Sequence, residues 1–302
     1  MVVHVVGNAC IDATFRLPRL PQPGETINAM SFVEGVGGKG ANQAVAAARC
    51  DAAVVLWTAI GNDAAADAIL RGLGAEAARI EAHRFDQPSD RSAVAVDASG
   101  ENNIISAVGC ARAYDPLSQT DCGKQFSQGD LVLLQGNLRV EITHDCLRAA
   151  KQAGATAVLN ASPLGDGPID LTDVDLLIVN APEARFLTGE TDPQEASLAL
   201  RRRGAEKVLI TLGAEGALLR DGDRAPLRVS APKVDALDTS GAGDVLCGVV
   251  VGALARGLTI AAAMRVAISA ASIAAGRAGA LTSCPGREEI AAIFANESDN
   301  HG

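Results

Sequence analysis

Short runs of apolar, mostly β-branched residues alternate along this chain with longer Ala- and Leu-rich stretches. The apolar runs predict buried strands, at residues 2–6, 53–59, 131–135, 157–160, 176–180 and 207–211. The stretches between them predict helices, at residues 40–49, 64–73, 142–153, 182–187 and 195–203. Such alternation is typical of parallel strands joined by right-handed helical crossovers. We therefore expect an α/β fold, a three-layer sandwich with a central, mostly parallel sheet flanked by helices.

Two segments depart from this rhythm. Residues 15–36 and 93–107 alternate apolar and polar positions, and each contains a turn signal, PQPG at 21–24 and ASGE at 98–101. A period of two predicts strands with one exposed face, here outside the main sheet. From the pattern alone, these strands are either a functional element or a pair of decorative hairpins.

Composition limits the class of protein. With 302 residues and 48% hydrophobic content, the chain suits one large α/β domain with an appendage. Its net charge of −10 argues against nucleic acid or an anionic membrane as the main partner. The start lacks the basic segment of a signal peptide, and the longest uncharged apolar run, residues 245–255, is too short to span a bilayer. We expect a soluble, cytoplasmic protein.

The cysteines and histidines do not form a recognisable metal or disulfide pattern. Seven cysteines form an odd set without a C-x-x-C pair, and the four histidines make no H-E-x-x-H motif. We interpret the cysteines as buried apolar side chains in a reducing compartment. The four scattered histidines lack the spacing of a zinc-hydrolase site, so such a site is disfavoured.

The segment DTSGAGD at residues 238–244 precedes the apolar run at residues 245–251. The small residues 241–243 lie where a loop must become a helix, so their backbone N–H groups are uncovered. A helix N-terminus carries a partial positive charge and binds phosphate-like anions. Asp244 falls in the first turn, and a base beside an anion hole is what phosphoryl transfer to a hydroxyl requires. The alternative is an ordinary Gly-rich turn with an aspartate at a helix start.

A second glycine cluster, GVGGKG at residues 35–40, formally fits the dinucleotide pattern G-x-G-x-x-G. That fingerprint belongs to the first strand–helix turn, here residues 7–10, which lacks it. The second strand also ends without the expected acidic residue. The cluster is not a Walker A loop either, because no Ser or Thr follows Lys39. Nicotinamide binding is therefore disfavoured.

Five motifs, in order along the chain, resemble those of the ribokinase-like (PfkB) carbohydrate kinases. The DTxGAGD signature is complete at residues 238–244, and GGKGANQA, the form found in ribokinases, is at residues 37–44. The other three are GNACID with PGET, NAPE and TLGAEG, at residues 7–12 with 23–26, 180–183 and 211–216. The resemblance implies a single ribokinase-like domain over residues 1–302. It also implies a small β-sheet lid, inserted at about residues 13–36 and 91–108, that closes over the sugar and often builds a dimer interface.

The resemblance implies an ATP-dependent sugar kinase. Asp244 would be the general base, and the anion hole would come from the N–H groups of Gly241, Ala242 and Gly243. Contacts to the sugar are implied for Asp12, Gly38, Lys39 and Asn42. Glycine allows the backbone to approach a ligand closely, while Asn42 and Asp12 offer hydrogen-bonding groups to hydroxyls. The alternatives are that Asn42 caps a helix and that Asp12 is a solvated carboxylate at a strand end.

The resemblance also implies nucleotide and metal contacts. The nucleotide contacts fall on Asn180, Thr211, Gly213 and Gly216, with the Ala- and Gly-rich residues 270–279 against adenine. Asn180 and Glu183 would hold Mg²⁺ mainly through water, although NAPE also resembles a capping box at a helix start. Many relatives bind K⁺ near the anion hole, and Asp238 and Ser283 stand where its ligands are expected.

Two positions depart from the ribokinase pattern. Asn137 follows the strand at 131–135 where ribokinases carry a Glu, so the sugar site loses a charged acceptor. Arg91 stands at the base of a lid strand, where ribokinases carry a small residue and relatives acting on phosphorylated or acidic sugars can carry Arg. Arg91 either contacts an anionic substrate or is a rim residue paired with Asp90.

Three functions are compatible with these residues. We favour a kinase for a neutral sugar, a pentose close to ribose, that uses ATP, Mg²⁺ and K⁺ and acts as a homodimer joined through the lid. The second is a kinase for a nucleoside, a sugar acid or a sugar phosphate; the aromatic content of 3% argues against stacking on a nucleoside base. The third is a sugar-binding protein that lost catalysis, which an intact Asp244 disfavours.

Overall fold

The central sheet has nine strands within residues 1–76, 78–98, 102–165 and 167–301, which the computed structural model describes. Neighbouring strands are parallel except at one edge, where the last three are antiparallel. The order across the sheet is β13 (Leu227–Val229), β12 (Ala217–Asp221), β11 (Lys207–Thr211), β10 (Leu176–Asn180), β9 (Thr156–Asn160), β8 (Leu131–Gln135), β1 (Val3–Val6), β4 (Val54–Ile60) and β5 (Arg79–Arg84).

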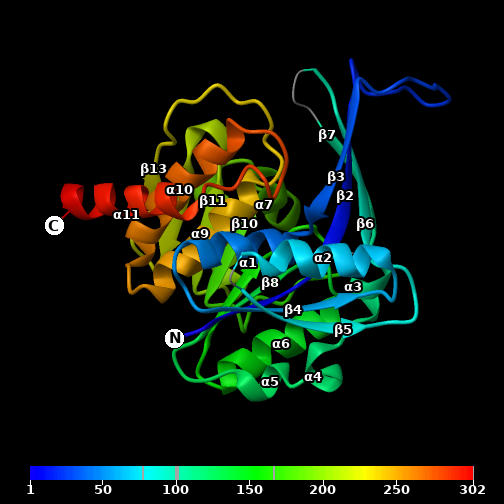
Figure 1. The fold of residues 1–302 in the computed structure, drawn as a ribbon. Coiled ribbons are helices and arrows are strands. Elements are labelled where there is room, and N and C mark those ends of the chain that lie inside the picture. The colour runs from blue at the N-terminus through cyan, green and yellow to red at the C-terminus, as the bar shows by residue number, and fades with distance from the viewer. Residues whose placement is uncertain (77, 99–101, 166, 302) are drawn as a thin grey trace.

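Helices cover both faces of this sheet. One hydrophobic core includes residues of α1 (Lys39–Arg49), α2 (Ala64–Gly74), α9 (Ala242–Ala255), α10 (Ile260–Ala275) and α11 (Arg287–His301). The other involves α3 (Gly109–Ala113), α4 (Pro116–Gln119), α5 (Cys122–Gln125), α6 (Val140–Gln152), α7 (Ala181–Thr188) and α8 (Pro193–Arg202). In Figure 1, α1 and α2 lie on one side of β4 and β5, and α4, α5 and α6 lie on the other. The predicted three-layer sandwich is confirmed.

The inner strands explain why the sequence shows continuous apolar runs. Every residue of β1 and β4 is buried, because a parallel strand covered by helices on both faces has no solvent side. Alternate residues enter the two cores: Val3 and Val5 pack into the first, and Val6 packs into the second. Strand β5, at the edge, has the polar sequence RIEAHR, and the hydrophobic pattern does not predict it.

A separate four-stranded sheet stands away from the central one (Figure 1). Its order is β3 (Ser31–Gly37), β2 (Cys10–Arg16), β6 (Arg91–Val96) and β7 (Asn102–Ala107). Strands β3, β6 and β7 largely coincide with the two segments whose period of two predicted strands outside the main sheet, whereas β2 begins earlier, at Cys10. Along β2, Asp12 and Thr14 line a cavity, while Phe15 is 37% exposed on the opposite face. We call this element the small sheet.

Two further sequence expectations concern the whole chain. All seven cysteines are buried and free of disulfide bonds, as their odd number and spacing predict. In the described part of the chain, no helix combines the length and apolar character needed to cross a membrane.

Candidate active site

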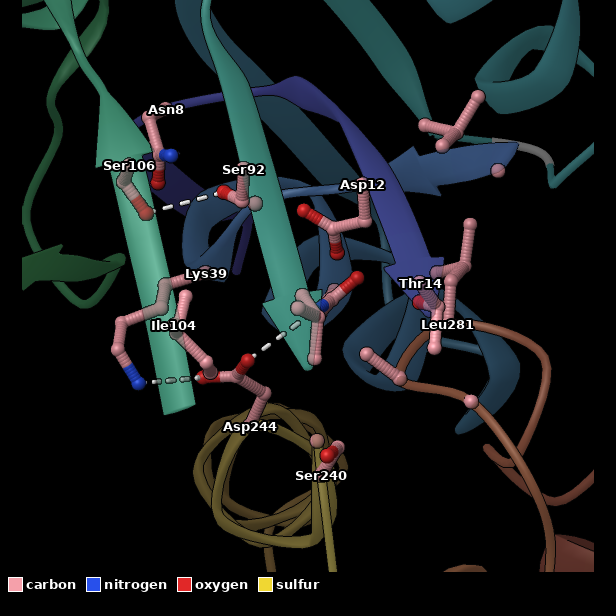
Figure 2. Close-up of a pocket in the computed structure, with 18 of the residues that line it drawn as sticks. Asn8, Asp12, Thr14, Lys39, Ser92, Ile104, Ser106, Ser240, Asp244 and Leu281 are labelled. Carbon is pink, nitrogen blue, oxygen red and sulfur yellow. Dashed lines mark hydrogen bonds and ion pairs between the residues drawn. The ribbon is translucent and has the colours of Figure 1, made fainter. Parts of the chain in front are cut away.

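A cavity of about 620 Å³ lies between the small sheet and the carboxyl ends of central strands. Figure 2 shows side chains from β2, β6 and β7 on one side and Asp244 of α9 on the other. Asn8, after β1, and Asn137, after β8, complete the sheet side. Ligands of open α/β sheets bind at this end because the loops after parallel strands converge there.

Asp244 is held at the cavity by side chains from the start of α1. It is 5% exposed and lies in the first turn of α9. Its carboxylate accepts hydrogen bonds from Asn42 Nδ2 (3.0 Å) and Gln43 Nε2 (2.9 Å). Lys39 Nζ lies 3.6 Å from Asp244 Oδ1 (Figure 2). The Asp244 charge raises the pKa of Lys39, so the amine carries a positive charge beside the carboxylate.

Buried carboxamides extend this arrangement behind Asp244. Gln43 Nε2 also donates to Asn160 Oδ1 (3.0 Å), and Gln135 Nε2 donates to Gln43 Oε1 (2.8 Å). Asn160 in turn donates to the Ile178 carbonyl (3.1 Å). Each bond orients the next amide, so Gln43 directs one N–H to Asn160 and the other to Asp244. Our sequence reasoning missed Gln43, Gln135 and Asn160; the available signal was a carboxamide adjoining a buried apolar run.

The turn before α9 requires glycine. Gly241 is the N-cap with φ 79°, and a Cβ there would lie 2.7 Å from Ala280 Cα. At Gly243 a Cβ would meet no protein atom within 4 Å, so this part of the turn is open. The Ala242 N–H donates to Thr239 O at 3.3 Å, a long bond. The first-turn amides of a helix lack helical partners, which makes the turn suited to bind an anion beside Asp244.

Asp12 brings a second carboxylate to the cavity, on the side of the small sheet (Figure 2). Gly37 of β3 leaves space for it, because a Cβ there would lie 1.9 Å from Asp12 Oδ2. The Cys10 thiol donates to Asp12 Oδ1 at 3.2 Å. Burial raises the pKa of Asp12 above its ordinary value. The predicted alternative, a solvated strand-end carboxylate, is wrong because Asp12 lies within β2 and faces the cavity.

Two amide oxygens in the cavity lining lack a protein partner. Asn42 Oδ1 and Asn137 Oδ1 are buried and accept no hydrogen bond within the described residues. A buried acceptor left unpaired is costly, and a ligand that supplies donors relieves that cost. Sugar hydroxyls are such donors. Asn42 lies inside α1, whose N-cap is Gly38, so the helix-cap alternative for Asn42 is wrong.

Packing against the segment after β1 explains why glycines stand at the start of α1, which the sequence does not reveal. Gly38 lines the cavity as expected, with φ 99°. A Cβ on Gly38 would lie 2.9 Å from Asn8 O, and one on Gly40 would lie 2.7 Å from Gly7 C. Close contact between this turn and the segment after β1 therefore requires both glycines, in addition to any approach by a ligand.

Four residues expected to contact the nucleotide, Asn180, Thr211, Gly213 and Gly216, lie at or just after the carboxyl ends of β10 and β11, outside the cavity lining. The segment expected against adenine, residues 270–279, includes the end of α10, and its Gly279 does line the cavity. Asn180 and Thr211 are register partners on these strands. After β11, Gly213 has φ 59° and open space where a Cβ would be. Gly216 has φ 96°, and a Cβ there would lie 1.9 Å from a backbone oxygen. Gly216 is thus required by packing, whereas Gly213 leaves an open surface at the sheet edge.

Asn180 and Glu183 form the capping box that their spacing predicts. Asn180 Oδ1 accepts the Glu183 N–H at 2.7 Å, and Glu183 Oε2 accepts the Asn180 N–H at 2.9 Å. Glu183 is close enough to Lys39 for its charge to raise the Lys39 pKa. The carboxylate and amide oxygens fit Mg²⁺, which takes oxygen ligands and keeps several waters. Within the described residues, no cluster of three His, Cys, Asp or Glu side chains could bind a metal.

The structure does not bring Arg91 into the cavity. Ser92 and Val94 face it, and strand alternation turns Arg91 to the opposite face. There its guanidinium lies 3.6 Å from Glu34 Oε1, with both side chains 52% exposed. The expected pair with Asp90 is also wrong, because Asp90 is buried and accepts backbone N–H groups at the start of α3. Besides Lys39, a second basic residue lines the cavity, Arg112, which sequence reasoning missed.

Asp238 and Ser283, expected to bind K⁺, are both engaged by protein groups. Asp238 accepts hydrogen bonds from the backbone N–H groups of Ser240 and Gly279, both at 3.0 Å, and from Arg16 Nη2 at 2.7 Å. The Ser283 hydroxyl donates to Ala280 O at 2.9 Å. A K⁺ ion on the Asp238 carboxylate would be repelled by the adjacent guanidinium. These two side chains therefore do not fit the expected K⁺ site.

Comparison with known proteins gives a consistent result. The profile described as pfkB family carbohydrate kinase matches residues 2–287. A deoxyribokinase of Salmonella typhi is 30% identical, over 96% of this chain and 97% of its own length. The structure of a ribokinase from Thermotoga maritima matches with a TM-score of 0.87 and 30% identity, covering 98% of this chain and 99% of that one. The Arabidopsis thaliana ribokinase complexed with ribose and ATP matches with a TM-score of 0.83 and 29% identity, covering 97% and 98%.

Proposed function

Because the chain belongs to the pfkB family of carbohydrate kinases, we propose that it transfers the γ-phosphoryl group of ATP to a hydroxyl of a small neutral sugar, first of all a ribose-like pentose. As a member of this family, the chain is a phosphotransferase with an alcohol group as acceptor. One observation carries the proposal: Asp244 lies beside the N-terminus of α9, on a cavity with unpaired acceptors for hydroxyl groups.

The proposed reaction uses Asp244 as the base. Asp244 takes the proton of the acceptor hydroxyl while the hydroxyl oxygen attacks the γ-phosphorus, and ADP leaves with the electrons of the broken P–O bond. The N–H groups of residues 241–243 stabilise the charge on the transferring group. Asn42 and Gln43 keep the base oriented. Asn180 and Glu183 would hold Mg²⁺ mainly through water, and the bound ion would neutralise charge on the phosphates.

A neutral sugar is supported by the chemistry of the cavity. Asn137 offers an uncharged acceptor, and Ser92 and Ser106 add hydroxyl groups that are 3.0 Å apart. Arg91, the residue that suggested an anionic substrate, faces away from the cavity. The relatives include a deoxyribokinase and a ribokinase complexed with ribose and ATP. Ribose and deoxyribose are therefore the leading substrates.

The decisive experiment measures ADP release with a panel of pentoses, hexoses, sugar acids, sugar phosphates and nucleosides. We expect neutral pentoses to have the highest kcat/KM. Asp244→Asn should lower kcat by about 10²–10⁴ and leave the affinities for sugar and ATP within a few-fold. Asp235→Asn, at an exposed aspartate nearby, is the control. Near wild-type turnover by Asp244→Asn would reject Asp244 as the base.

An anionic sugar is the second candidate, and Arg112 favours it because this basic residue lines the cavity. If the substrate carries a carboxylate or phosphate, Arg112→Ala should raise its KM by about tenfold or more through loss of a charge-assisted bond. The KM for ATP should not change. Arg91→Ala, on the outer face, is the matched control. A neutral sugar as best substrate, with no effect of Arg112→Ala on its KM, excludes this candidate.

We further propose that the small sheet acts as a lid and joins two chains. Its outer face exposes Phe15 (37%), Phe32 (52%) and Ile105 (76%), and register places these residues on one side of the sheet. Apolar groups gathered on one exposed face are typical of an interaction surface. We also propose that the protein resides in the cytoplasm, which the proposed use of ATP and the seven free cysteines support. We assign no nucleic-acid or membrane partner.

A further inference from the structure

The Asp238 carboxylate lies where three separate segments meet. Asp238 begins the DTSGAGD motif and is 1% exposed. Its Oδ1 accepts the Ser240 N–H, which shapes the turn leading to α9, and its Oδ2 accepts the N–H of Gly279 from the loop after α10. Arg16, the last residue of β2, donates to Oδ2 from the small sheet at 2.7 Å.

This junction adjoins the turn that we propose as the anion hole. A Cβ on Gly241 would lie 2.7 Å from Ala280 Cα, so the loop held by Asp238 packs directly against the N-cap of α9. A change in the position of Gly279 or Ser240 would therefore shift the backbone amides of the turn. The bonds to Asp238 are consequently part of what places the anion hole.

A buried carboxylate in this position needs a positive charge. Burial opposes ionisation of Asp238, but the Gly279 and Ser240 hydrogen bonds and the Arg16 charge together hold its pKa below the ordinary value. The Arg16 side chain is only 25% exposed, so its charge is incompletely screened by water. Removing one partner of a pair buried like this leaves an uncompensated charge, which is strongly destabilising.

We propose that the Arg16 guanidinium is the resident counter-ion of Asp238 and replaces the monovalent cation expected beside the anion hole. The guanidinium satisfies the charge of the carboxylate and repels a second cation from it. Unlike a free ion, the guanidinium belongs to a residue of the small sheet. Its bond to Asp238 therefore links the small sheet to the turn at the start of α9. Phosphoryl transfer by this chain therefore does not depend on K⁺. The inference rests on the proposed function only in taking the α9 turn as the anion hole.

The first measurement compares activity with ATP and the best sugar in KCl and in tetramethylammonium chloride. We expect the same kcat and KM in both salts for the wild type. Arg16→Ala should lose at least about tenfold in kcat/KM for ATP in tetramethylammonium chloride, because the Asp238 charge is left unpaired. Added KCl or guanidinium chloride should restore most of this loss. Arg16→Lys, which keeps the charge, should stay independent of K⁺.

The control is Arg19→Ala, which removes another arginine of the same region whose partner is the exposed Glu25. It should match the wild type in both salts. The inference is overturned if the wild type needs K⁺ for activity, or if Arg16→Ala works equally well in both salts. If Arg16→Ala does not fold, the wild type and Arg16→Lys still test the proposal. Activity of either protein that depends on K⁺ contradicts it.

A second measurement does not require the chain to be a sugar kinase. The unfolding temperature of the ligand-free protein is recorded by circular dichroism in both salts. We expect no difference for the wild type and Arg19→Ala, but a rise of at least about 2 °C in KCl for Arg16→Ala, because an ion that binds only the folded state stabilises it. Absence of that rise, with the variant folded, contradicts the counter-ion role whichever substrate the protein uses.

Discussion

At the residue scale, Asp12 and Asn42 separate substrate binding from positioning of the base. Asp12 faces the cavity from the small sheet, whereas Asn42 also donates to Asp244. Asp12→Ala should therefore raise the KM for sugar by about tenfold or more, from the loss of hydrogen bonds worth about 1–3 kcal/mol, with a smaller effect on kcat. Asn42→Ala should raise that KM and lower kcat as well. Steady-state kinetics with both substrates checks this; equal losses for sugar and ATP would point to a folding defect instead.

The pKa of Asp12 gives a pH dependence with a definite sign. Its ordinary value is 3.8, and burial raises it in the folded protein. The ionised carboxylate accepts hydrogen bonds from sugar hydroxyls at both oxygens, whereas the acid form has lost acceptor capacity. Sugar affinity should thus fall as the pH drops through the raised pKa, at a pH above 3.8. Calorimetric titration with sugar should show this decline for the wild type and a flat profile for Asp12→Asn.

At the scale of elements, the start of α7 combines a capping box with the proposed Mg²⁺ site. Glu183→Gln keeps an oxygen that can accept the Asn180 N–H but removes the charge. The Mg²⁺ concentration for half-maximal activity should therefore rise several-fold, while the unfolding temperature stays the same. Glu183→Ala should also lower the unfolding temperature, because it removes the reciprocal cap.

Titration of activity with MgCl₂ measures the Mg²⁺ requirement of both variants, and thermal melts measure their unfolding temperatures. Glu190→Gln, an exposed glutamate just after α7, is the control and should change neither quantity. An unchanged Mg²⁺ requirement in Glu183→Gln would remove Glu183 from the metal site and leave only its role as a cap.

At the scale of the whole molecule, the outer face of the small sheet is the candidate dimer interface. Ile105→Glu places a charge among Phe15, Phe32 and the small residues between them, and burying an unpaired charge is costly. We expect a dimer for the wild type and a monomer for this variant by sedimentation velocity. Phe186→Glu is the control, since Phe186 is 74% exposed on α7 and lies outside the small sheet. A monomeric wild type, or identical behaviour of both variants, would contradict the interface.

The local features of the fold could be predicted from the sequence because they depend on neighbouring residues. The inner strands are buried on both faces, so their apolar runs identify them directly. The turn at Gly241 and the capping box at Asn180 and Glu183 are likewise formed within a few residues. The polar edge strand β5 lacks such a signal, because a partly exposed strand has no continuous apolar run.

The tertiary structure alone decided which residues, distant in the sequence, contact one another around the cavity. Asn42 and Asp244 are 202 positions apart, and Arg16 and Asp238 are 222 apart. The motifs predict that Asn42, Asp238 and Asp244 belong to one site, whereas Arg16 lies outside every motif. The contacts of all four residues depend on how α1, α9 and the small sheet pack. Arg91 illustrates the same limit over a single residue, because the phase of β6 against the cavity decides that Ser92 faces inward. Pairing and strand phase are properties of packing, and the sequence by itself determined only the local conformations that packing brings together.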